Sequence, residues 1–138
     1  MSDHGLQPLL DWYARLTPAS LAEIGQYYAA DAHFRDPFND VCGVAAIKAI
    51  FDHMFAVTQA PRFVFVEQLQ QGEQAFVTWR FDCVIRRRLW QIEGSTYLVF
   101  GADGRVVEHR DYWDAAGQLY EKLPLIGGVL RLLKRSMR

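Results

Sequence analysis

The amino-acid sequence predicts an α+β fold in which N-terminal helices pack on a curved, mostly antiparallel sheet. Apolar residues recur at helical spacing in the first 57 residues, whereas long segments with strand-like alternation fill the region from 62 to 113. Turn signals separate these segments, namely Gly72 and the GADG sequence at 101–104. Helices followed by a run of strands favour helices on one face of a sheet over alternating βαβ units.

Three helices are expected in the N-terminal part of the chain. The segments 5–16 and 44–57 both carry apolar residues at helical spacing. Between them, Ser20 followed three residues later by Glu23 is a capping-box pattern, which predicts a second helix over roughly 21–30.

The strands are expected after residue 30. In the DAHFRDPFND sequence at 31–40, Pro37 disfavours helical backbone at Asp36, so this stretch is predicted to be extended and to end in a turn. The remaining strands are predicted from alternation at 62–69, 74–86, 93–100 and 105–113.

Composition limits the classes to which the protein can belong. A chain of 138 residues, 51% of them hydrophobic, indicates one folded domain spanning 1–138. Lys and Arg total 15 against 16 Asp and Glu, so the basic surface that a nucleic-acid partner requires is not expected. Cys42 and Cys83 belong to no CxxC or Cys/His cluster, which predicts reduced thiols and no metal site.

No targeting segment is expected. The N-terminus has no basic stretch followed by an apolar core, and no apolar run reaches the roughly 18 residues of a membrane span. The predicted compartment is therefore the cytoplasm.

The last segment, at about 123–138, is predicted to be a basic amphipathic helix. After Glu121 every charged side chain is basic. We expect its apolar side to cover the mouth of the sheet or a dimer seam, and the alternative is contact with an anionic membrane surface.

The AFVTWRFDCVI stretch places two charges inside an apolar strand. Side chains two residues apart share a face, so Arg80 and Asp82 lie on one face and Trp79 and Phe81 on the other. We expect Arg80 and Asp82 to face inward, where charges must be paired or used. Trp79 and Phe81 would then form an outer apolar patch, which predicts a homodimer through the outer face of the sheet.

Two further segments send carboxylates to one face. Asp111 shares its face with His109, and Asp36 ends the extended stretch. If these faces form the hollow of one sheet, both carboxylates meet Asp82 beside Arg80. Such a cluster can hold one acid protonated and another ionised, as acid–base catalysis needs. The alternative is a structural or ligand-binding cluster, and His109 is either a proton shuttle or a hydrogen-bonded core residue.

The sequences YAADAHFRDPFNDVCGVAAI at 28–47 and GRVVEHRDYWD at 104–114 resemble the NTF2-like superfamily. It includes SnoaL-like polyketide cyclases, ketosteroid isomerases and limonene-epoxide hydrolases. The resemblance implies a cone-shaped, strongly curved sheet wrapped by helices, with an apolar pocket and often a dimer through the outer sheet face.

Residues 28–37 are similar to the segment of ketosteroid isomerases that carries the catalytic base. This resemblance implies that Asp36 is a proton-shuttling base. The isomerase's oxyanion-hole tyrosine falls near Trp12 or Tyr13, and its second, acidic donor falls on Thr96.

A different site is implied by the similarity to limonene-epoxide hydrolases. Arg80 and Asp82 match the Arg-x-Asp pair of that family, and Asp111 in HRDYWD matches its third member. Asp111 would activate a water, Asp82 would protonate the epoxide oxygen, and Arg80 would hold both. The water-positioning tyrosine and asparagine of that family correspond here to Phe34 and Asp36.

Aromatic side chains are expected to form the core and to line the pocket of an open cone. The predicted substrate-binding residues are Trp12, Tyr13, Phe34, Phe51, Phe55, Thr96 and Trp113. The predicted catalytic residues are Asp36, Arg80, Asp82, His109 and Asp111.

Three functions follow as hypotheses. The first is a cofactor-independent enzyme that isomerises, cyclises or hydrates a small hydrophobic molecule by acid–base chemistry. The second is a non-catalytic small-molecule-binding protein of the same fold. The third is a protein that docks to a membrane or a partner through its basic C-terminal segment.

Overall fold

A computed structural model describes residues 5–120, and it has the α+β architecture that the sequence predicts. The helical elements are α1 (Leu6–Ala14), the 3₁₀ helix η1 (Ser20–Gln26), α2 (Val44–Val57) and α3 (Ala115–Tyr120). The strands are β1 (Tyr28–Arg35), β2 (Asp40–Cys42), β3 (Gln59–Gln71), β4 (Gln74–Ile85), β5 (Arg88–Phe100) and β6 (Val106–Tyr112).

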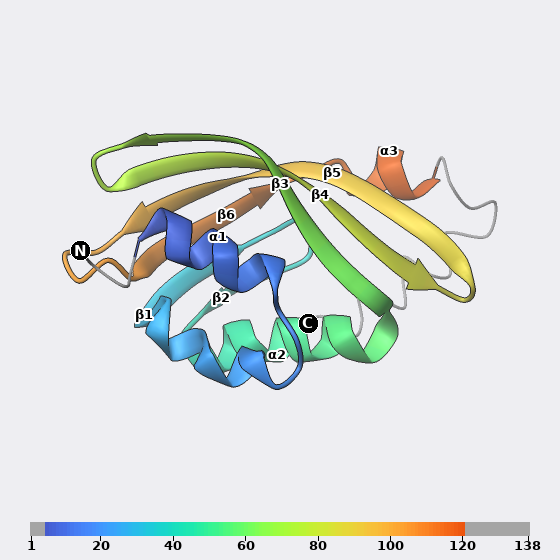
Figure 1. The fold of residues 1–138 in the computed structure, drawn as a ribbon, viewed down its shortest axis with the longest axis horizontal. Coiled ribbons are helices and arrows are strands. Elements are labelled where there is room, and N and C mark those ends of the chain that lie inside the picture. Colours follow the sequence, from blue (N-terminus) through green and yellow to red (C-terminus); the bar gives the residue numbers. More distant parts are fainter. Residues whose placement is uncertain (1–4, 121–138) are drawn as a thin grey trace.

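The strands form one curved sheet in the order β2-β1-β6-β5-β4-β3. Neighbouring strands are antiparallel, except that β1 and β6 run parallel. The long strands β3, β4 and β5 arch over α1, and α2 lies below them on the same side (Figure 1). Because α1 contacts β3 while α2 contacts β1, β2 and β3, the helices cover the concave side of the sheet.

The predicted helices are confirmed at two of their three positions. α2 has the predicted bounds, and α1 lies within the predicted segment 5–16. The second helix is shorter than predicted, because η1 ends at Gln26 and β1 begins at Tyr28. Its capping box is wrong as well. The Ser20 hydroxyl accepts from the backbone N–H of Thr17 over 2.9 Å, and the backbone N–H of Ser20 donates to the Thr17 hydroxyl over 3.0 Å. The Ser20 side chain therefore bonds to Thr17, three residues earlier, and not to Glu23.

The turn between β4 and β5 lacks a sequence signal. β5 begins at Arg88, whereas alternation predicts its start at residue 93. The turn residues Arg86 and Arg87 have φ angles of 50° and 68°, the left-handed conformation that Asn-Gly normally supplies in a two-residue hairpin. Since arginine seldom adopts this conformation, the RRR sequence does not indicate a turn.

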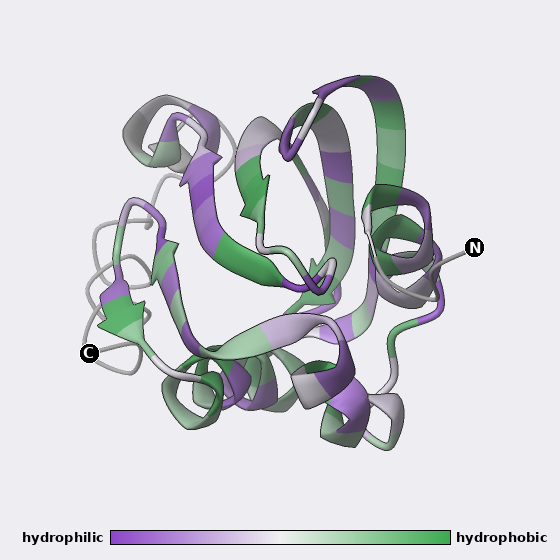
Figure 2. Ribbon diagram, turned by 90° about the vertical axis from the view of Figure 1, so that its left-hand side faces the viewer, coloured by the Kyte–Doolittle hydropathy of each residue, from purple (hydrophilic) through white to green (hydrophobic). Residues whose placement is uncertain are grey.

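Burial alternates along the strands, as a sheet with one covered face requires. In β4, Ala75, Val77 and Trp79 are buried, and the residues between them are exposed or half-buried. The same alternation appears as bands of hydrophobic and hydrophilic colour along the ribbons (Figure 2). The largest side chains buried between sheet and helices include Leu9, Leu21, Ile24, Tyr28, Phe34, Ile47 and Leu98.

At the β2-β1-β6 edge of the sheet, one histidine links three strands. His33 lies with Nε2 2.5 Å from a carboxylate oxygen of Asp40 on β2 and with Nδ1 2.9 Å from Glu108 on β6. The hydrogen bond to Asp40, followed by that to Glu108, raises the pKa of His33. Asp40 is therefore hydrogen-bonded to His33.

The predicted basic helix at 123–138 lies outside the described residues. Among the helices of residues 5–120, none is both long and apolar enough to cross a membrane.

Candidate active site

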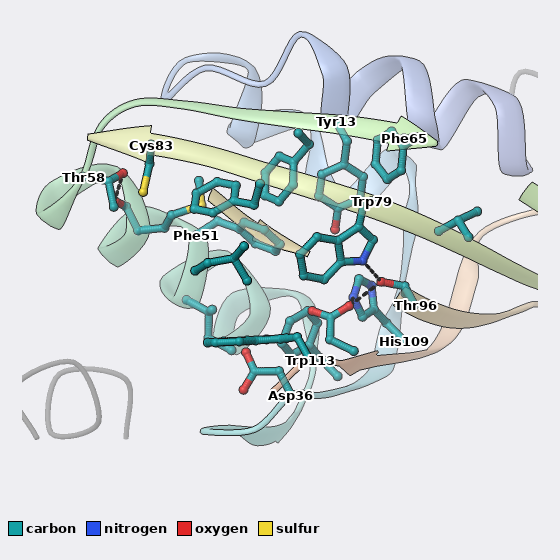
Figure 3. Close-up of a pocket in the computed structure, with 18 of the residues that line it drawn as sticks. Tyr13, Asp36, Phe51, Thr58, Phe65, Trp79, Cys83, Thr96, His109 and Trp113 are labelled. Carbon is teal, nitrogen blue, oxygen red and sulfur yellow. Dashed lines mark hydrogen bonds and ion pairs between the residues drawn. The ribbon is translucent and has the colours of Figure 1, made fainter. Parts of the chain in front are cut away.

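A cavity of about 170 Å³ lies between the concave face of the sheet, α1 and α2. Aliphatic and aromatic side chains form most of its lining, and its acidic residues are Asp36 and Asp111. No lysine or arginine of the described chain lines it. Thr96 and His109 lie at one end of the cavity, while Thr58 and Cys83 lie at the opposite end (Figure 3).

Most of the predicted site residues meet in this cavity. Those that line it are Tyr13, Phe34, Asp36, Phe51, Thr96, His109, Asp111 and Trp113. Within residues 5–120, no three His, Cys, Asp or Glu side chains gather as a metal ion would require.

The prediction that Arg80 and Asp82 face inward is wrong. The alternation is as expected, but the opposite face of β4 turns into the cavity, and neither residue lines it. Arg80 Nε instead pairs with Asp82 Oδ1 over 2.9 Å, with the arginine side chain 39% exposed. Burying the apolar face stabilises the fold, whereas an inward guanidinium would lose its hydration. The Asp–Arg–Asp arrangement of the epoxide hydrolases is therefore not formed.

The same inversion changes the argument for a dimer. Trp79 and Phe81, predicted on the outer face, line the cavity, and Trp79 is only 8% exposed. They are covered within one chain and require no partner. The homodimer stays a prediction that must be judged on other residues.

Two of the predicted substrate-binding residues do not line the cavity. Trp12 is buried, but it stacks on Tyr27 and its Nε1 donates to the carbonyl oxygen of Ser20 over 3.1 Å. Phe55 is partly buried and packs against the core. Of the two aromatic residues proposed near the oxyanion hole, Tyr13 is the one that reaches the cavity.

A buried chain of hydrogen bonds connects Tyr13 with Asp111. The hydroxyl of Tyr13 bonds to that of Tyr28, which lies 2.7 Å from Nδ1 of His109. Nε2 of His109 lies 2.7 Å from Oδ1 of Asp111. Because Tyr28 and His109 are 0% and 5% exposed, solvent cannot readily replace these bonds.

A second arm reaches Asp111 from the sheet. Nε1 of Trp79 donates to Oγ1 of Thr96 over 2.8 Å, and Oγ1 of Thr96 lies 2.5 Å from Oδ1 of Asp111 (Figure 3 shows Trp79, Thr96 and His109). Since the indole N–H can only donate, the Thr96 hydroxyl is free to direct its own proton to Asp111.

Both arms end on the same oxygen of Asp111. Oδ1 is placed to accept from the Thr96 hydroxyl and lies next to Nε2 of His109, whose Nδ1 faces the hydroxyl of Tyr28. Burial raises the pKa of Tyr28 and of Tyr13, so both stay protonated at neutral pH. Oδ2 of Asp111 receives no hydrogen bond from residues 5–120, and 17% of the side chain is exposed.

Asp36 is the second carboxyl group of the cavity, and its surroundings differ. Its Oδ1 accepts hydrogen bonds from the backbone N–H groups of Phe38 and Asn39, over 2.8 Å and 2.7 Å. Burial nevertheless raises the pKa of Asp36, and the negative charge of Asp111 raises it further. Asp36 therefore holds a proton more readily than an exposed aspartate does.

Sequence reasoning missed Tyr28 and placed Trp79 on the wrong face. The sequence did carry a signal for Trp79, since its face of β4 is entirely apolar and the other face holds two charges. Gly94, its register partner on β5, makes room for the indole, because a Cβ there would lie 2.6 Å from the ring. Tyr28 had no such signal, because its partners are 15 and 81 residues away in the chain.

The family model described as a SnoaL-like domain matches residues 9–109. The chain belongs to the SnoaL-like domain family. The resemblance to the NTF2-like superfamily is thereby confirmed, and the solved structures below have the same fold. Comparison with curated proteins finds no match.

Several solved structures share the fold of this SnoaL-like domain at low sequence identity. An NTF2-like protein of unknown function from Burkholderia pseudomallei has a TM-score of 0.72 and 18% identity, covering 83% of this chain and 93% of that one. A hypothetical protein with a ketosteroid isomerase-like fold from Catenulispora acidiphila, in complex with trimethylamine, has a TM-score of 0.71 and 15% identity, with 84% and 92% covered. A steroid delta-isomerase from Pseudomonas aeruginosa has a TM-score of 0.62 and 20% identity, with 94% and 85% covered.

Proposed function

We propose that this SnoaL-like domain is a cofactor-independent acid–base enzyme that isomerises or cyclises a small hydrophobic carbonyl compound. The observation that carries the proposal is the hydrogen bonding of Asp111. One of its oxygens is held by Thr96 and His109, and the other is unbonded within the described chain beside an apolar cavity. A fixed, ionised carboxylate in such a cavity is suited to remove a proton from carbon.

The proposed step divides the chemistry between the two carboxyl groups. Oδ2 of Asp111 takes a proton from the carbon next to the carbonyl group, and the C–H electron pair forms an enolate. Asp36 in its protonated form donates to the enolate oxygen and limits the charge that develops there. Asp111 then returns its proton to another carbon of the substrate. In a cyclisation the enolate carbon instead attacks a second carbonyl carbon, the C=O π bond breaks, and the alkoxide oxygen that forms takes the proton from Asp111.

Comparison supports this class of reaction without naming the substrate. The chain belongs to the SnoaL-like domain family, and a structural neighbour is named a steroid delta-isomerase. We do not retain epoxide hydration, because the Arg80–Asp82 pair lies outside the cavity.

The base-catalysed ring opening of 5-nitrobenzisoxazole tests the proposal without the natural substrate. A base takes the proton from C3 of the isoxazole ring, the N–O bond breaks, and a coloured nitrophenolate forms. We expect Asp111→Asn to lower the rate roughly 100-fold or more, since the base is lost while the hydrogen bonds to Oδ1 can persist.

Asp82→Asn is the matched control, because it neutralises an aspartate on the outer face. Its rate should equal that of the wild-type protein. Equal rates for Asp111→Asn and the wild type, with both proteins folded by circular dichroism, would show that Asp111 is not the base.

A further inference from the structure

A groove of about 800 Å³ adjoins the cavity at the end of β1 and β6. It shares Asp36, Asp111 and Trp113 with the cavity, so the two spaces meet at the candidate active site. Unlike the cavity, the groove also contains basic side chains, those of Arg35 and Arg110. Pro37, Tyr112 and Asp114 complete its lining.

The two arginines are neighbours in the sheet. Arg35 on β1 and Arg110 on β6 are register partners in the parallel pair of strands. Side chains at paired positions emerge on the same face, so the two positive charges lie together on the face opposite to that of His109 and Asp111. The groove contacts them at the ends of β1 and β6. Like charges at such positions are destabilising unless an anion lies between or beside them.

The guanidinium group of Arg110 is incompletely satisfied. Its Nε is buried and has no hydrogen-bond partner among residues 5–120, although 37% of the side chain is exposed. Its two other nitrogens make only long contacts, 3.3 Å to the hydroxyl of Tyr112 and 3.4 Å to Glu108. A buried donor without a partner is costly, and it marks a place where a ligand can supply the missing acceptor.

Several carboxylates near the two arginines have other hydrogen-bond partners. Asp36 accepts from the amides of Phe38 and Asn39, and Asp111 accepts from Thr96 and His109. Asp114 accepts from the backbone N–H of Gly117. Asp40, the register partner of Arg35 on β2, is bonded to His33. Within residues 5–120, Arg35 has no ion pair and Arg110 has one, to Glu108 over 3.4 Å.

We propose that Arg35 and Arg110 bind the carboxylate of a ligand whose apolar part occupies the adjoining cavity. The proposal names the substrate class of the proposed active site, an amphiphilic organic acid, and to that extent it rests on the proposed function. A carboxylate offers two planar acceptor oxygens, which match the forked donors of a guanidinium group. Anchored there, the ligand turns around the ends of β1 and β6, past Asp36 and Asp111, to reach the cavity.

Phenylalkanoic acids of increasing length, from phenylacetate to 6-phenylhexanoate, test this site when each is compared with its neutral amide. Isothermal titration calorimetry at neutral pH measures both affinities. We expect at least one acid to bind about tenfold more tightly than its amide, as a charge-assisted pair predicts. Arg110→Gln and Arg35→Gln should each weaken the acid several-fold and leave the amide unchanged.

Arg80→Gln is the matched control, because it removes a guanidinium group that lies on the outer face and is paired with Asp82. It should bind acids and amides as the wild type does. Equal affinity for acids and amides at every length, an absence of binding by all acids, or an equal loss in Arg80→Gln would each overturn the proposal.

The nitrobenzisoxazole assay separates this proposal from the proposed function. That probe is neutral, so its turnover depends on Asp111 and not on the two arginines. If no acid binds more tightly than its amide but Asp111-dependent turnover of the probe is seen, only the carboxylate site is overturned. If acids bind tightly but Asp111→Asn does not change the turnover of the probe, only the catalytic proposal is overturned.

Discussion

Asp36 and Asp111 are two aspartates of one apolar cavity with different hydrogen-bond neighbours. Asp111 is held by the hydroxyl of Thr96 and the ring of His109. Asp36 has two backbone amides, yet burial and the nearby charge of Asp111 raise its pKa. At the scale of single residues, this difference is the basis on which we propose one group as the base and the other as the acid.

The raised pKa of Asp36 makes a prediction for stability. The native state binds this proton more tightly than the unfolded chain, whose aspartate pKa is about 3.9. Stability is therefore lost as the pH rises from that value through the raised native pKa. Asp36→Asn, which carries no charge, should melt at a higher temperature than the wild type at pH 7 and at nearly the same temperature at pH 4.

Thermal unfolding followed by circular dichroism measures both values. Asp31→Asn, which changes an exposed aspartate of β1, controls for a general effect of removing one charge. The same difference from the wild type at both pH values would contradict the assignment of a buried, proton-holding Asp36.

At the scale of elements, the β4–β5 hairpin shows a conflict between sequence and backbone. Arg86 and Arg87 adopt positive φ, which costs a residue with a Cβ about 1 kcal/mol or more. The twelve-rung ladder between β4 and β5, from Gln74↔Val99 to Ile85↔Arg88, keeps the turn closed. The strands on either side hold the aromatic lining of the cavity, so pairing overrides the local preference of the turn.

Replacing one turn residue should relieve this strain. Arg87→Gly is expected to stabilise the protein by about 1 kcal/mol, because glycine adopts positive φ without a Cβ contact. Urea unfolding measures the change. Arg87→Ala also removes the charged side chain but keeps Cβ, so it should give no such gain. Equal stabilisation by both variants would show that the gain comes from removing the charge and not from relieving the backbone strain.

At the scale of the whole molecule, the outer face of the sheet is the surface that stays open. Leu69 and Phe76 are register partners on β3 and β4, and they are 74% and 40% exposed. The predicted homodimer would cover them. Light scattering after size-exclusion chromatography should then give twice the monomer mass for the wild type and the monomer mass for a Leu69→Glu, Phe76→Glu variant.

Ala22→Glu, on the exposed side of η1, is the control and should keep the dimer mass. A monomeric wild-type protein at micromolar concentration would contradict the predicted homodimer.

Periodicity and turn residues were sufficient for much of the fold. The bounds of α2, the mostly antiparallel sheet and the placement of His109 and Asp111 on one face all follow from local patterns. The second helix and the β4–β5 turn did not follow, because Tyr28 pairs with the distant β6 and because arginine does not signal positive φ.

The sequence by itself determined which residues share a face, because side-chain direction along a strand depends only on backbone geometry. Which face turns inward was decided by tertiary structure. The apolar face of β4 packs against the helices and carries Trp79 into the cavity, while Arg80 and Asp82 keep contact with water. The chain from Tyr13 through Tyr28 and His109 to Asp111 also exists only after folding, because hydrogen bonds between distant residues depend on packing in three dimensions.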